Sequence, residues 1–146
     1  DRYPESLRLG CEDNALPFHV ACESGLLETV KYIFEADRDC INAKTNSGFY
    51  TIHKAMGGGS IMHERDQVEI VQFLLECDPD CAAKVPSIPQ LYRSLPLHIA
   101  CSRTHANMNI IRLLFDAYPE AIHVWPSGWR TISVDLLSFA RISCNR

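Results

Sequence analysis

The chain of 146 residues repeats one short sequence pattern at nearly even intervals. The windows LPFHVACE, YTIHKAMG, LPLHIACS and RTISVDLL align without gaps and begin 34, 45 and 35 residues apart, at Leu16, Tyr50, Leu95 and Arg130. A unit of this length cannot bury its apolar face alone, whereas stacked copies form a continuous core. The repeat therefore predicts one domain built as a stack of similar units.

Two helices are predicted in each complete unit. The first three windows are followed by the segments ETVKYIFEADRDC, EIVQFLLECDPDC and NIIRLLFDAYPEA. Their apolar residues have helical spacing, as in Val30, Ile33 and Phe34, so these segments are predicted to be amphipathic helices. The windows are predicted to be short helices too, because Pro17 stands in the first turn of the first copy and Gly25 follows at its exit. The fold class is therefore all-α.

We place the complete units at residues 14–47, 48–92 and 93–127. Residues 1–13 are interpreted as the end of a preceding unit, since DRYPES resembles DAYPEA of the third unit, and residues 128–146 as a partial terminal unit. The middle unit has seven extra residues between its helices, within GGGSIMHERDQ, and four more in VPSIPQLYR. Both insertions are predicted to lie in loops. This organisation indicates a segment of a longer array, or an array that ends in a degenerate unit.

Charge and cysteine content exclude several classes of protein. The 14 Lys and Arg against 18 Asp and Glu give a net charge of -4 without a basic stripe, which disfavours nucleic acid and anionic membrane as partners. The apolar runs are far shorter than the ~20 residues that span a bilayer. Seven cysteines, an odd number without tandem CxxC pairs, cannot form a complete disulfide framework. We expect an intracellular, cytoplasmic protein.

No sequence motif indicates a metal or a cofactor. Cys77 and Cys81 are spaced CxxxC and do not form two compact ligand pairs. The segment MGGGSIMHERD has three glycines and the possible metal ligands His63, Glu64 and Asp66. Its glycines are not followed by lysine and serine or threonine, and they lie between helices rather than after a strand. We therefore expect a surface insertion at 57–67 that can carry specificity, and no bound metal or cofactor.

A cysteine nucleophile is a possible alternative, because His19 precedes Cys22 by three residues and His98 precedes Cys101 in the same way. Residues i and i+3 share a helix face, and a thiol beside an imidazole can act as a nucleophile. However, Met56 takes the cysteine position in the second copy and a leucine takes it in the fourth. Methionine can replace a packed cysteine but not a reactive one. We therefore predict a structural role for these residues and no enzyme activity.

The repeated windows resemble ankyrin repeats over nearly the whole chain. The resemblance rests on LPFHVA, IHKA and LPLHIA, on GLLE before the second helix, and on the Ser-Gly pairs of the loops. It implies a solenoid of stacked antiparallel helix pairs with projecting hairpin-like loops. It also implies that His19, His53 and His98 hydrogen-bond the backbone around the turn and link neighbouring repeats. Asn14 and Arg93 stand where the family has glycine; asparagine accepts the left-handed conformation better than arginine does.

The resemblance further implies that a partner protein binds to the loop tips and to the inner face of the first helices. Aromatic residues at such tips are typical of interfaces, although the two tryptophans could instead pack against a further repeat. The predicted binding residues are Asn46, Ser47, Phe49, Leu91, Tyr92, Ser94, Trp125 and Trp129 at the tips, and Glu23, Lys54 and Arg103 on the helices. We expect a monomeric, non-catalytic protein-interaction module. The alternatives are a regulatory or recruiting segment of a larger enzyme, such as a kinase or ubiquitin ligase, and a cysteine hydrolase.

Overall fold

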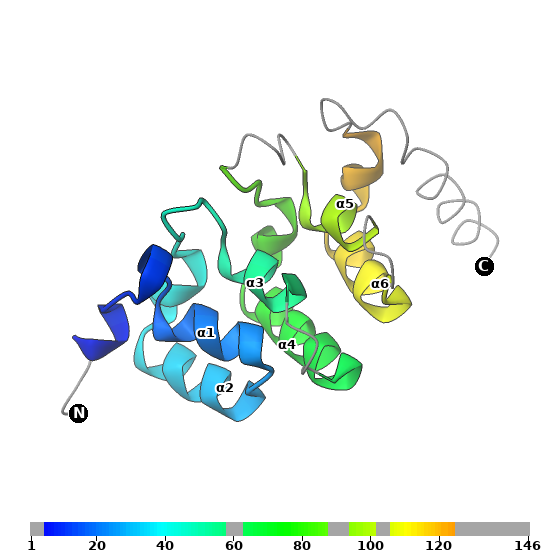
Figure 1. The fold of residues 1–146 in the computed structure, drawn as a ribbon. Coiled ribbons are helices and arrows are strands. Elements are labelled where there is room, and N and C mark those ends of the chain that lie inside the picture. Colours follow the sequence, from blue (N-terminus) through cyan, green and yellow to red (C-terminus); the bar gives the residue numbers. More distant parts are fainter. Residues whose placement is uncertain (1–4, 58–62, 88–93, 102–105, 125–146) are drawn as a thin grey trace.

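The computed structural model describes residues 5–57, 63–87, 94–101 and 106–124. In this part of the chain the secondary structure is helical, apart from one isolated bridge between Lys44 and Tyr50. Three helix pairs follow one another along the chain and stack side by side (Figure 1). The pairs are α1 (Pro17–Ser24) with α2 (Leu27–Ala36), α3 (Thr51–Gly57) with α4 (Glu64–Cys77), and α5 (Pro96–Cys101) with α6 (Met108–Ala117). The prediction of helix pairs in an all-helical chain is confirmed for these residues.

Short 3-10 helices flank the pairs. One 3-10 helix follows the second helix of each pair, at the acidic or prolyl turns seen in the sequence. The amino-terminal segment carries two more, before α1. Their bounds are η1 (Ser6–Arg8), η2 (Glu12–Asn14), η3 (Arg38–Asn42), η4 (Pro79–Ala83) and η6 (Pro119–His123). Within the described ranges, no helix is long and apolar enough to cross a membrane.

Equivalent positions of the units form one continuous core. Helix α1 packs on α2 and α3, and α4 packs on α3 and α6. The third position of each window is fully buried, and so are the inward positions of the second helices. Each such side chain contributes about 1.5–3 kcal/mol through its removal from water. The residues are Phe18, Ile52 and Leu97 in the windows, and Val30, Val71, Ile111, Ile33, Leu74 and Leu114 in the second helices.

The insertion between α3 and α4 is only partly a loop, contrary to the prediction. Helix α2 begins one residue before Glu28, whereas α4 begins five residues before the equivalent Glu69. Four of the inserted residues therefore lengthen the helix. Gln67, in this added turn, donates through Nε2 to the Ala55 and Met56 carbonyls at 3.2 and 2.9 Å. These bonds satisfy carbonyl groups in the last turn of α3, where a helix leaves carbonyls without intrahelical partners.

The loops between units are joined to one another through their backbones. The Asn46 N–H donates to the Asp13 carbonyl at 2.8 Å, and the Ser47 N–H donates to Asp13 Oδ1 at 2.7 Å. On the other side, the Ser87 N–H donates to the Gly48 carbonyl at 3.0 Å. We call Asp13, Asn46, Ser47, Gly48 and Ser87 the tip row. These bonds fix each loop against the next loop along the stack.

The loops before the first and second windows use the left-handed backbone region. Asn14 has φ of 53°, in agreement with the prediction that it replaces a loop glycine, and Asp13 beside it has φ of 63°. Arg93, at the corresponding position of the third unit, lies outside the described residues. In the second loop Gly48 takes this conformation, with φ of 85°. A left-handed conformation strains any residue that has a Cβ atom, glycine being the exception.

Replacing Gly48 with alanine should lower the free energy of unfolding by about 1–3 kcal/mol. The new Cβ would adopt an unfavourable φ and would lie 2.8 Å from Ser87 Cβ and 2.9 Å from Ser87 N. Urea denaturation followed by circular dichroism measures the change. Gly57→Ala is the matched control, because a Cβ atom there meets nothing within 4 Å. If both variants lose equal stability, the close packing of Gly48 against Ser87 is wrong.

Candidate protein-binding surface

The tip row has exposed side chains, whereas backbone groups of its residues form hydrogen bonds within the protein. Asn46 and Ser47, both predicted binding residues, have exposed side chains, and their N–H groups are bonded to Asp13. Hydrogen bonding to Ser47 holds the pKa of Asp13 below its ordinary value, so this carboxylate stays charged at neutral pH. The tip of the second loop is therefore held in place before any partner arrives.

Phe49 and Lys54 meet on the side of the stack formed by the first helices. The Lys54 ammonium lies 5.7 Å from the centroid of the Phe49 ring and 3.5 Å from Glu23 Oε2. Lys54 on α3 thus joins the loop to α1. The ion pair is partly exposed and contributes little stability by itself. We call Glu23, Phe49 and Lys54 the Phe49 cluster. All three are predicted binding residues, and the structure brings them together.

Ser94 was predicted at a loop tip, and this prediction is wrong. Its side chain is fully buried, because it occupies the position just before the window, as the buried Ala15 does in the first unit. Its hydroxyl oxygen has no hydrogen-bond partner among the described residues. The remaining predicted binding residues, Leu91, Tyr92, Arg103, Trp125 and Trp129, lie outside the described residues.

Each window histidine accepts a hydrogen bond at the start of its own helix. The Nδ1 atoms of His19, His53 and His98 accept from the N–H groups of the first window residues at 3.0, 3.1 and 3.0 Å. All three imidazoles are buried. Since Nδ1 accepts, the ring is neutral and its proton is on Nε2. The imidazole therefore acts as a side-chain cap for a backbone group that the helix leaves unpaired.

The second ring nitrogen reaches the far end of the same unit. His19 Nε2 donates to the Ala43 carbonyl at 3.2 Å, and His98 Nε2 donates to the Ala121 carbonyl at 3.1 Å. His53 Nε2 lies near the Lys84 backbone but has no hydrogen-bond partner among the described residues. These carbonyls lie at the 3-10 turns that close each unit. In the first and third units this bond joins two ends of one unit, whereas the resemblance implied a link between neighbouring repeats.

The nucleophile interpretation fails for the first His-Cys pair. Both ring nitrogens of His19 are bonded to backbone groups, so neither can take a proton from a thiol. Cys22 is fully buried, and burial raises the pKa of its thiol well above the ordinary value. Burial likewise raises the pKa values of Cys40 and Cys81 to about 12. A thiolate nucleophile does not form at neutral pH under these conditions. In the described ranges, no group of three His, Cys, Asp or Glu side chains could hold a metal ion.

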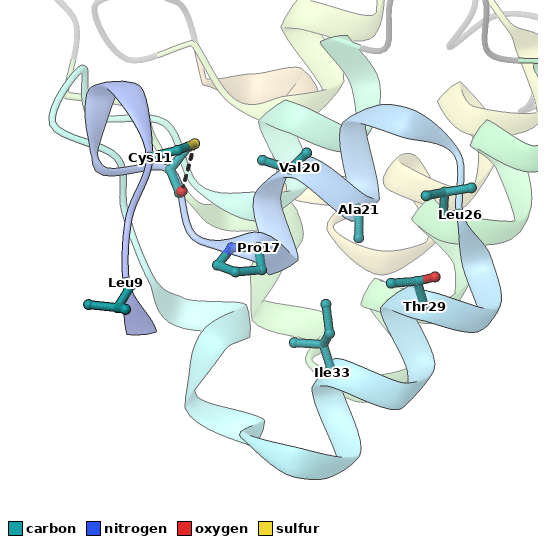
Figure 2. Close-up of a pocket in the computed structure, with 9 residues that line it drawn as sticks. Leu9, Cys11, Pro17, Val20, Ala21, Leu26, Thr29 and Ile33 are labelled. Atoms are coloured by element: carbon teal, nitrogen blue, oxygen red, sulfur yellow. Dashed lines mark hydrogen bonds between the residues drawn. The ribbon is translucent and has the colours of Figure 1, made fainter. Parts of the chain in front are cut away.

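An apolar pocket that the sequence did not predict lies on the outer side of the first helix pair (Figure 2). Its volume is about 300 Å³, and its lining includes Leu9, Val20 and Leu26, which are all exposed. Thr29 also lines it, whereas the equivalent Ile70 of the second pair is fully buried in the stack. The pocket therefore lies on the side of the first pair whose equivalent, in the second pair, is buried in the stack.

The fold and the surface together define a class: a stack of helix pairs that presents ordered loop tips. No family model matches the chain, and no solved structure matches it significantly. The chain is similar to the probable 26S proteasome regulatory subunit p28 of Saccharomyces cerevisiae, with 29% identity over 132 residues. The match covers 88% of this chain and 49% of the yeast protein, so the chain spans about half the length of that relative. This distant similarity fits a protein-binding role.

Acid should destabilise the fold before carboxylates are protonated. Burial lowers the pKa of all three window imidazoles, that of His53 to about 4, from an ordinary value of 6.5. Between these two values the unfolded chain binds more protons than the folded chain, so stability is lost as the pH falls. Lowering the pH from 7.5 to 5 should remove about 2 kcal/mol through His53 alone. Urea unfolding at both pH values measures this loss.

The variant His53→Gln should reduce this pH dependence, because glutamine stays neutral and can still accept the Tyr50 N–H bond. His63→Gln is the control, since His63 is exposed at the start of α4 and takes no part in the window bonds. An unchanged difference between pH 7.5 and pH 5 in the His53 variant would show that this imidazole is not the group responsible.

Proposed function

We propose that the chain is an ankyrin-repeat module that binds another protein through the tip row and the inner face of the first helices. The observation that supports this most is the tip row itself. Its backbone groups are bonded from loop to loop, and the side chains of Asn46 and Ser47 are left exposed. A surface ordered in advance loses little conformational entropy when a partner binds.

The Phe49 cluster is proposed as the anchor of this surface. Phe49 is half-buried, so its ring is fixed by its neighbours and still partly accessible. Aromatic rings in such settings supply a large share of binding energy at protein interfaces. The Lys54 and Glu23 charges beside the ring offer polar contacts at its rim. Leu91 and Tyr92 at the end of the second unit, and Arg103, Trp125 and Trp129 in the third and fourth units, are proposed to continue the surface.

The ankyrin assignment rests on the sequence resemblance, on the stacked helix pairs and on the histidine bonds shared by the windows. We further propose that the module works as a cytoplasmic monomer, without catalysis, metal or cofactor, and without binding nucleic acid or membrane. The alternative is a regulatory or recruiting segment of a larger enzyme. The similarity to half of a regulatory subunit favours testing that alternative, and it makes the 26S proteasome the first candidate partner.

Binding should be tested with purified 26S proteasomes and with proteins captured on the immobilised chain. The double variant Phe49→Ala, Lys54→Glu should weaken the affinity for the partner at least about tenfold, because it removes the aromatic anchor and reverses its neighbouring charge. Biolayer interferometry measures the affinity, and circular dichroism checks that helix content and melting temperature are retained.

Tyr32→Ala is the matched control for this test. Tyr32 is an aromatic residue on α2 with 73% of its surface exposed, and it belongs neither to the tip row nor to the Phe49 cluster. Its removal should leave the affinity unchanged. Equal loss of affinity in both variants, or full affinity in the double variant, would refute the proposed surface.

A further inference from the structure

Ser87 presents an accessible hydroxyl beside a lysine of the preceding unit. It is exposed and lies in the irregular segment that follows η4. Its N–H is bonded to the Gly48 carbonyl, and its Oγ accepts a hydrogen bond from Lys44 Nζ at 2.9 Å. Lys44 is 43 residues earlier in the chain. The fold therefore holds this hydroxyl at a fixed place next to an ammonium group.

The Lys44 ammonium forms no ion pair with a carboxylate of the described residues. Its Nζ lies 5.1 Å from the centroid of the Tyr50 ring, and Lys84 Nζ lies 5.6 Å from the same centroid. Lys84 is already paired with Asp78 at 2.8 Å. Of the two cations on this ring, Lys44 is therefore the one available to an anion.

We propose that Ser87 is a phosphorylation site and that Lys44 holds the phosphate. A protein kinase would transfer the γ-phosphoryl group of ATP: the bond between the γ-phosphorus and the bridging oxygen breaks, and a bond from phosphorus to Ser87 Oγ forms. ADP leaves, and the hydroxyl proton passes to the kinase base. The phosphate carries about -1.5 to -2 charge and can form charge-assisted hydrogen bonds with Lys44. Those bonds would clamp the loop of the first unit to the end of the second.

Comparison with Ser47, the other exposed serine of the tip row, shows why position 87 is suited to phosphorylation. Ser47 is also exposed in the tip row, but its N–H is bonded to the Asp13 carboxylate at 2.7 Å. A phosphate on Ser47 would face a negative charge, which repels it. A phosphate on Ser87 faces Lys44. The same modification at two nearby positions should therefore change stability in opposite directions.

The test uses the full chain with phosphoserine introduced genetically at position 87. Its melting temperature should exceed that of the unmodified chain by about 3–6 °C, and Lys44→Gln should abolish most of this gain. Phosphoserine at position 47 is the matched control and should lower the melting temperature. The proposal is overturned if the phosphate at 87 gives no gain, or if the gain is the same with glutamine at 44.

Mass spectrometry tests whether the modification occurs. The protein isolated from its own cells, with phosphatases inhibited, should yield a peptide carrying phosphate on Ser87, and a Ser87→Ala variant should not. Recovery of that peptide only in the unmodified form would overturn the proposal. None of these experiments measures partner binding. If the phosphorylation proposal fails, the proposed function is therefore unaffected.

Discussion

The first and third units each contain a buried imidazole that joins the beginning of the unit to its end. In the first and third units, one ring nitrogen accepts the N–H that opens the first helix, and the other donates to a carbonyl at the closing 3-10 turn. The bonds require a neutral ring, because a protonated Nδ1 could not accept. They also set where the next loop leaves the unit, and hence where the tip row lies. The packing of the helices and the position of the proposed binding surface thus depend on the same hydrogen bonds.

Local features of the fold were predictable from sequence because they depend on spacing and backbone conformation. The helix pairs follow from the period of residues such as Val30 and Ile33, and the left-handed turn at Asn14 follows from the tolerance of asparagine for that region. The role of His19 was expected only in part. Its partner at Ala43 is 24 residues away, and a resemblance cannot say which side of a unit boundary that partner occupies.

The candidate surface was less predictable, because it depends on contacts between distant residues. Lys54 could have been a solvated charge, and only the fold brings it to Glu23 on another helix and to the Phe49 ring. The hydrogen bond from the Ser47 N–H to the Asp13 carboxylate joins residues 34 positions apart, and no sequence pattern indicates it. Ser94 was misplaced at a tip, although the equivalent Ala15 of the first unit is an apolar residue and both positions are buried.

The insertion shows how the stack tolerates extra residues without losing its register. In the first pair, Gly25 ends α1 with a left-handed turn, and its N–H donates to the Ala21 carbonyl. In the second pair the connection is longer, and Gln67 satisfies the carbonyls at the end of α3 with its side chain. Because both arrangements satisfy an equivalent carbonyl, that of Ala21 or of Ala55, the helices of the first and second pairs can pack alike. Length added at this point therefore changes the surface of the module while the buried positions stay equivalent.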